Sequence, residues 1–80
     1  MKVVSYSRTA IKALKTIPAK DRDAIMDKMD GHAAGQKQDV VALKGSGFMR
    51  LRHRDWRVVF EEGAEAIAVL DIAHRREVYR

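Results

Sequence analysis

Arginine is concentrated in one short segment of the chain. Residues 50–57 read RLRHRDWR and contain four arginines and one aspartate. A guanidinium group stays charged at pH 7, and its planar donors can bind two oxygens of one phosphate group. Arginine planes also stack on unpaired nucleobases. This segment therefore has the chemistry of a surface that binds phosphates or RNA.

The last residues of the sequence form a second basic group, HRREVYR, which begins at His74. Tyr79 stands among these arginines, and a phenol ring can stack on a base or contact a ribose hydroxyl. If the end of the chain reaches the first arginine group, the two groups form one site. The alternative is a frayed basic tail, and the residue pattern leaves both open.

Alternating side chains predict the two strands that position the first arginine group. A turn centred on Arg54 and Asp55 would join these strands into a hairpin. In that register the apolar residues of both strands share one face, whereas a slip of one residue would scatter them. The predicted buried face consists of Met49, Leu51, Val58 and Phe60.

The same register places three arginines on the opposite face of the hairpin. Arg52 lies directly across from Arg57, and Arg50 is one step along. Like charges that face each other destabilise a sheet, and a bound phosphate backbone would remove this cost. The alternative is that acidic side chains of the chain itself pair with these arginines.

Two helices are expected before the hairpin. Ser7 fits the N-cap of a helix over residues 8–16, Pro18 ends it, and Gly31 or Gly35 ends the second helix. Apolar residues at three- and four-residue spacing predict their buried faces. These residues are Ala10, Ile11, Leu14 and Ile17 in the first helix and Ile25, Met26, Met29 and Ala33 in the second.

Two further strands complete the expected fold. Lys2–Tyr6 is short and valine-rich, and Ile67–Ala73 is apolar on both faces except at Asp71, as in a central strand. The element order is β-α-α-β-β-β. We therefore predict a single α+β domain over residues 1–80, with a small antiparallel or mixed sheet and a two-helix hairpin packed on one face.

Composition narrows the class of protein. The chain has 80 residues, a net charge of +5 and no cysteine. We expect a cytoplasmic protein without disulfides and without a membrane partner, because the longest apolar run, Ala66–Leu70, is far too short to span a bilayer. The three histidines match no zinc spacing, so no metal and no other cofactor are expected.

Four motifs in the second half of the chain support a family resemblance. They are Leu43-Lys44-Gly45, Phe48 before Arg50-Leu51-Arg52, Asp55-Trp56-Arg57-Val58-Val59-Phe60, and His74-Arg75-Arg76-Glu77-Val78-Tyr79. In these motifs the run from Leu43 to Tyr79 resembles the RelE/ParE toxin superfamily of type II toxin–antitoxin systems, and the RelE-like branch in particular. One departure is Arg54, which stands where the family often has glycine.

The resemblance implies a ribosome-dependent, metal-independent mRNA endoribonuclease that inhibits translation. In such an enzyme a ribose 2′-hydroxyl attacks the adjacent phosphate. Carried over by motif, the catalytic positions are Arg50, Arg52, Arg57, Arg75 and Tyr79, and the further RNA-binding positions are Lys44, Arg54, His74 and Arg76. Arg76 remains an alternative to Arg75. Because arginine stabilises charge but does not move protons at pH 7, Tyr79, or else His74, would act as the acid or base.

The resemblance also implies partners and leaves other functions open. The expected partners are a cognate antitoxin, mRNA and the decoding site of the ribosome, with operator DNA bound only through the antitoxin. The first alternative is a ParE-like, non-enzymatic inhibitor of DNA gyrase. The second is a toxin-fold binding module that acts only with its antitoxin.

Overall fold

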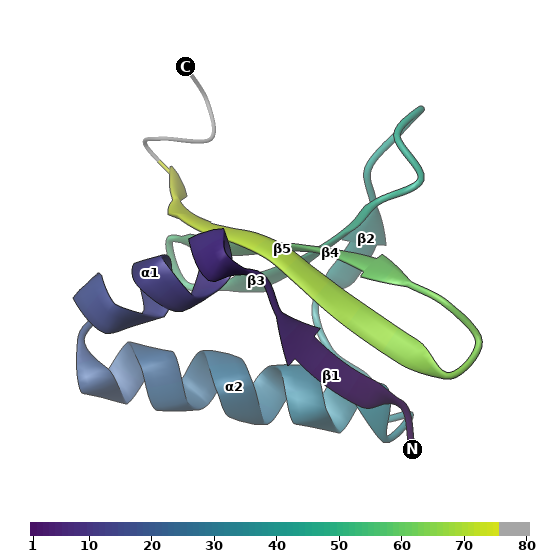
Figure 1. Ribbon diagram of the computed structural model, residues 1–80, viewed down its shortest axis with the longest axis horizontal. Coiled ribbons are helices and arrows are strands. Elements are labelled where there is room, and N and C mark those ends of the chain that lie inside the picture. Colours follow the sequence, from purple (N-terminus) through teal and green to yellow (C-terminus); the bar gives the residue numbers. More distant parts are fainter. Residues whose placement is uncertain (76–80) are drawn as a thin grey trace.

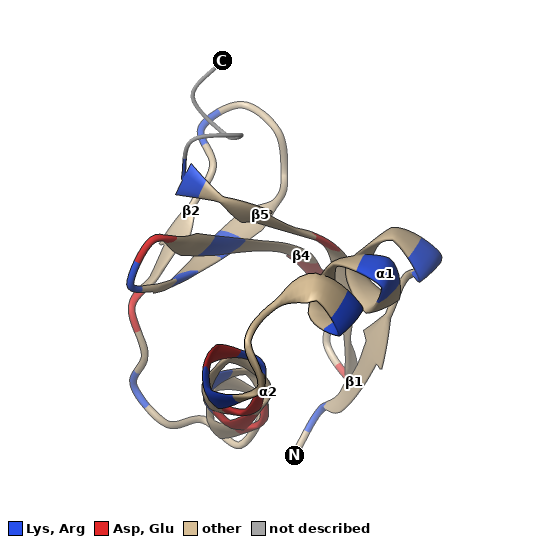
Figure 2. Cartoon of the chain, turned by 90° about the vertical axis from the view of Figure 1, so that its left-hand side faces the viewer, with Lys and Arg blue, Asp and Glu red and all other residues tan. Residues whose placement is uncertain are grey.

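The computed structural model describes residues 1–75 (Figure 1). Along the chain its elements are β1 (Val3–Tyr6), α1 (Arg8–Thr16), α2 (Ala19–Ala33), β2 (Val40–Ala42), β3 (Met49–His53), β4 (Trp56–Glu62) and β5 (Ala66–His74). The strands form one mixed sheet in the order β1-β5-β4-β3-β2. Only the β1–β5 pair is parallel. Both helices cover the same face of the sheet (Figures 1 and 2), as predicted for this α+β fold.

The hairpin register agrees with the prediction. Met49 pairs with Phe60, Leu51 with Val58, and Arg52 with Arg57. Leu51, Val58 and Phe60 are fully buried, and they pack with residues of both helices and β5 in one core. Central strand β5 lies between β1 and β4, which explains why it is apolar on both faces.

Strand β2 was not predicted. It has only three residues, which is too short for a visible alternation of apolar and polar side chains, and it pairs with β3 at the edge of the sheet. Asp39, just before β2, accepts a backbone hydrogen bond from Arg52 (3.0 Å). The extra strand thus places an acidic residue beside the arginine hairpin.

The helix ends follow the expected signals. The Oγ of Ser7 accepts a hydrogen bond from the backbone N–H of Ala10 (3.1 Å), as an N-cap does. Helix α1 ends at Thr16, before Pro18, and α2 ends at Ala33. Gly35, with φ +86°, follows in the left-handed conformation that often closes a helix, so the second of the two predicted glycines is correct.

Two residues of the predicted helix faces are misplaced. Ile11 and Met26 are 44% and 37% exposed, whereas the other predicted stripe residues are buried. Each stands next to a fully buried residue, Ala10 or Ile25, and the short helices turn only one narrow stripe toward the sheet. Spacing alone assigned both flanking residues to the core, which was wrong. Within residues 1–75, no helix is long and apolar enough to cross a membrane.

Candidate functional site

The candidate site is the sheet face that the helices leave uncovered, here called the open face. Arg50, Arg52 and Arg57 alternate with the core residues of β3 and β4, so their side chains leave the sheet on this face. Arg52 and Arg57 are direct cross-strand neighbours. The β2–β3 loop projects on the same side (Figure 1). The structure therefore brings the three hairpin arginines together, as the sequence predicted.

Arg57 is an unusually buried cation. It is only 7% exposed, and its Nη1 donates hydrogen bonds to the backbone carbonyls of Arg54 (3.0 Å) and Trp56 (3.3 Å). Its Nε is buried without a hydrogen-bond partner among residues 1–75, and so is the Nε of Arg50 on the neighbouring strand. None of the ion pairs within residues 1–75 includes either arginine. An anion that reached either Nε would satisfy a donor whose burial otherwise costs free energy.

Arg52 has a different environment. Its Nε donates a hydrogen bond to Oδ2 of Asp39 at 2.8 Å, and both side chains are about half exposed (53% and 46%). Of the three hairpin arginines it is the one with an acidic partner in the described chain. An exposed pair of this kind is weak and salt-sensitive, so RNA phosphates can compete with Asp39 for the guanidinium.

The β3–β4 turn brings the end of β5 to this site. The backbone N–H of Arg75 donates to the carbonyl of Asp55 (2.6 Å), and its Nη1 lies 3.9 Å from Oδ1 of the same residue. Arg54 adopts a φ of +53°, a conformation that is costly for a residue with a side chain. The turn therefore organises two candidate arginines, since its carbonyls hold Arg57 and Arg75.

The remaining predicted residues lie in different places. Lys44 is exposed in the β2–β3 loop, at the end of β3 opposite the turn. The guanidinium of Arg54 lies 3.9 Å from Oδ1 of Asp21 in α2.

His74 lies on the face opposite the arginines. Its ring packs edge-on against Trp56, its neighbour across the strands (5.1 Å between ring centroids, 90°). Arg76 and Tyr79 lie outside the described residues.

A buried histidine beside the turn was missed at the sequence level. His53 is 7% exposed and lies between Oδ1 of Asp21 (Nε2, 3.1 Å) and Nζ of Lys28 (Nδ1, 2.9 Å). Asp21, Ile25 and Lys28 are spaced by four and three residues, which places them on one side of α2. This spacing, beside the fully buried Ile25, was the signal that could have identified the contact.

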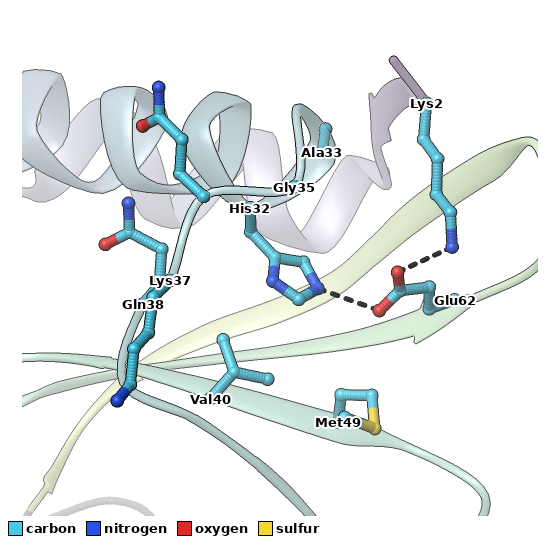
Figure 3. Close-up of a pocket in the computed structure, with 10 residues that line it drawn as sticks. Lys2, His32, Ala33, Gly35, Lys37, Gln38, Val40, Met49 and Glu62 are labelled. Atoms are coloured by element: carbon cyan, nitrogen blue, oxygen red, sulfur yellow. Dashed lines mark hydrogen bonds and ion pairs between the residues drawn. The ribbon is translucent and has the colours of Figure 1, made fainter.

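A second polar network lies in an open pocket of about 640 Å³ at the other end of α2 (Figure 3). Glu62 accepts hydrogen bonds from Nζ of Lys2 (2.7 Å) and binds Nε2 of His32 (2.8 Å). The hydrogen bond from Lys2, followed by that from His32, lowers the pKa of Glu62 below its ordinary value of 4.5. These contacts join the residue before β1 to α2 and β4, so we regard this network as structural.

Comparisons with known proteins agree with the fold and add a family. Residues 4–79 match the family described as the ParE toxin of the type II toxin–antitoxin system parDE. Similar solved structures include the RelB–RelE complex of Methanococcus jannaschii (23% identity, 92% of this chain and 93% of that one, TM-score 0.78) and the RelE–RelB complex of Pyrococcus horikoshii OT3 (24%, 92% and 94%, 0.75). The intact RelBE complex of E. coli is similar in fold at 14% identity (92% and 96%, 0.78). No match to a curated protein was found.

Proposed function

The chain belongs to the ParE toxin family of type II toxin–antitoxin systems, within the RelE/ParE superfamily, and we propose that this toxin is an endoribonuclease. Its substrate would be mRNA in the decoding site of the ribosome, and its reaction would need no metal. The observation that carries this proposal concerns Arg50 and Arg57 on the open face, whose Nε atoms are buried and have no partner in the part of the chain that the structure describes.

The arginine pair fits the charge requirements of RNA cleavage. When a ribose 2′-oxygen attacks the adjacent phosphorus, the new O–P bond forms, the bond to the 5′-oxygen breaks, and the pentacoordinate phosphate carries extra negative charge. Donors already aimed at that position stabilise the charge without reorganising. The Nε atoms of Arg50 and Arg57 support this role, because neither has a partner among the described residues and each keeps a donor that a phosphate could use.

Proton transfer requires a different group. The 2′-hydroxyl must lose a proton and the leaving 5′-oxygen must gain one, and arginine does neither at pH 7. We assign this role to Tyr79, with Arg75 holding the phosphate from the end of β5, where it adjoins the turn through Asp55. His74 is a weaker candidate, because its ring packs against Trp56 on the opposite face.

The proposed partners follow from this chemistry and from the relatives. The similar RelE structures are complexes with the antitoxin RelB. We expect a cognate antitoxin here as well, one that places acidic side chains over the open face and so both blocks the site and stabilises a small domain. Operator DNA would be bound through the antitoxin alone, and a toxin that acts on ribosomes would work in the cytoplasm.

A second candidate function is inhibition of DNA gyrase without catalysis. The family match itself favours it, because the matching family is that of ParE. In that case the open face would bind a protein surface, and Arg50 and Arg57 would pair with carboxylates of the partner. The two functions stop different cellular processes and can be separated directly.

Pulse labelling after induction of the toxin separates the two functions. The endoribonuclease predicts that protein synthesis stops within minutes while DNA synthesis continues, with new mRNA ends inside translated codons in primer extension. A block in DNA synthesis with an SOS response and intact mRNA would refute it and support gyrase inhibition. A toxin that is harmless when produced without its antitoxin would refute both and favour a binding module.

A further inference from the structure

We propose that His53 is a positioning residue that fastens the β3–β4 turn to helix α2 and, through this turn, fixes the guanidinium group of Arg57. The mechanical part of this inference is independent of what the site binds. Its consequence for RNA rests on the proposed function.

The contacts of His53 define its hydrogen-bonding state. An ammonium group can only donate, so Lys28 donates to Nδ1 of His53 (2.9 Å), and Nδ1 carries no proton. The other nitrogen, Nε2–H, donates to Oδ1 of Asp21 (3.1 Å). The imidazole therefore bridges two residues of α2, and its 7% exposure protects both hydrogen bonds from water.

The same carboxylate also faces the turn. Nη1 of Arg54 lies 3.9 Å from Oδ1 of Asp21, although the Arg54 side chain is 72% exposed and the attraction is correspondingly weak. His53 and Trp56 form the last pair before the turn. The turn residues, Arg54 and Asp55, therefore directly follow His53, which α2 holds in place. Helix α2 thus restrains the turn from the face opposite the candidate site.

The β3–β4 turn also orients the side chain of Arg57. The carbonyl of Arg54 accepts a hydrogen bond from Nη1 of Arg57 (3.0 Å), and the carbonyl of Trp56 accepts a second (3.3 Å). Arg54 has a φ of +53°, a conformation that persists only where the surroundings enforce it. If the link to His53 is lost, the turn can relax, and the carbonyl that orients Arg57 moves with it.

Substitutions at His53 separate this role from plain stability. His53→Leu keeps an apolar side chain of similar bulk and removes both hydrogen bonds, whereas His53→Gln retains a donor that can reach Asp21. The matched control is Ile67→Val, which loosens the core at the other end of the sheet, where Ile67 pairs with Val4 and Glu62. If His53→Leu does not fold, Lys28→Met removes one of the two hydrogen bonds, the one that α2 donates to Nδ1 of His53.

Two measurements apply to each variant. The first is the Arg57 Nε–H resonance in a ¹⁵N–¹H correlation spectrum, and the second is the affinity for a short single-stranded RNA by fluorescence anisotropy. We expect His53→Leu, or Lys28→Met, to shift or broaden the Arg57 resonance. RNA binding should weaken about tenfold, which is the effect of losing one hydrogen bond between the Arg57 guanidinium and RNA. His53→Gln should recover most of both signals, and Ile67→Val should match the wild type in both.

The outcomes distinguish the two proposals. An unchanged Arg57 resonance in His53→Leu, or an equal change in Ile67→Val, would overturn the positioning role. A wild-type protein that binds no RNA would instead refute the proposed function, and the Arg57 resonance would still decide the role of His53.

Discussion

At the residue scale, the environments of the arginines matter more than their number. Arg57 is nearly inaccessible and, within residues 1–75, bonds only to backbone carbonyls, whereas Arg52 is half exposed and paired with Asp39. A buried cation without a counter-ion is destabilising unless a ligand compensates for it. For this reason we place the phosphate at Arg57 and Arg50 and assign Arg52 to a replaceable outer contact.

The ionisation of Glu62 should make the stability of the folded protein depend on pH. Hydrogen bonds from Lys2 and His32 lower its pKa below 4.5, so the folded state binds a proton at Glu62 less readily than the unfolded state does. The resulting stabilisation is complete above about pH 4.5, the ordinary value, and disappears as the pH falls through the lowered pKa.

Urea unfolding between pH 3 and pH 6 tests this prediction. Glu62→Gln should be less stable than the wild type at pH 6, and the difference should shrink toward pH 3. Glu65→Gln, an exposed substitution just beyond the same strand, is the control and should follow the wild-type profile. A difference between Glu62→Gln and the wild type that stays constant over this range would contradict the account.

At the element scale, Ser7 links helix α1 to a β-bulge in strand β5. Val59 pairs with Asp71 while Phe60 pairs with Val69, which leaves Leu70 as an extra residue in β5. The Oγ of Ser7 donates to the Leu70 carbonyl (2.6 Å) while it caps α1. One hydroxyl therefore provides a hydrogen-bond partner for a backbone N–H at the start of α1 and for a backbone carbonyl in the bulge.

Ser7→Ala should lower the free energy of unfolding by about 1–2 kcal/mol, because the cap is lost and the Leu70 carbonyl loses its partner. Thr16→Ala, at an exposed hydroxyl near the other end of α1, is the matched control and should change it by less than about 0.5 kcal/mol. Chemical denaturation of both variants provides the measurement. Equal losses in the two variants would show that the bulge contact of Ser7 is unimportant.

Elements with a local signal were predictable from the sequence. Ser7 and Pro18 marked the ends of α1, and the alternation of Leu51 and Val58 with arginines specified the hairpin register. Strand β2 was missed because its three residues owe their conformation to pairing with β3, a contact that local sequence does not encode.

The candidate site was predictable to the same extent. Side-chain alternation placed the hairpin arginines on one face, but it could not rank them. The burial of Arg57, the Arg52–Asp39 pair and the link from His53 to α2 all depend on contacts between distant segments. Placement of His74 beside the arginines followed from its position in the chain, whereas its pairing with Trp56 turns the ring to the opposite face.

At the scale of the whole molecule, the two faces of the sheet have different roles. The helices cover one face of the sheet (Figures 1 and 2) and bury the core. The strand register places the hairpin arginines on the other, open face. Helix α1 carries basic but no acidic residues, whereas α2 carries residues of both signs, including all the aspartates of the helical hairpin (Figure 2). One of these aspartates, Asp21, contacts His53 and Arg54 beside the turn. The helices thus support the site from behind and do not cover it, although Arg57 itself is buried and Arg52 is exposed.

The central claim is that Arg57, held by the turn, binds the scissile phosphate of mRNA on the ribosome. Primer extension on mRNA from cells that express Arg57→Lys tests it most directly, because lysine keeps the charge but loses the planar donors. The matched control is Arg8→Lys, an exposed position in α1 away from the open face. We predict at least about tenfold less cleavage for Arg57→Lys and wild-type cleavage for Arg8→Lys. Undiminished cleavage by a folded Arg57→Lys toxin would contradict the account.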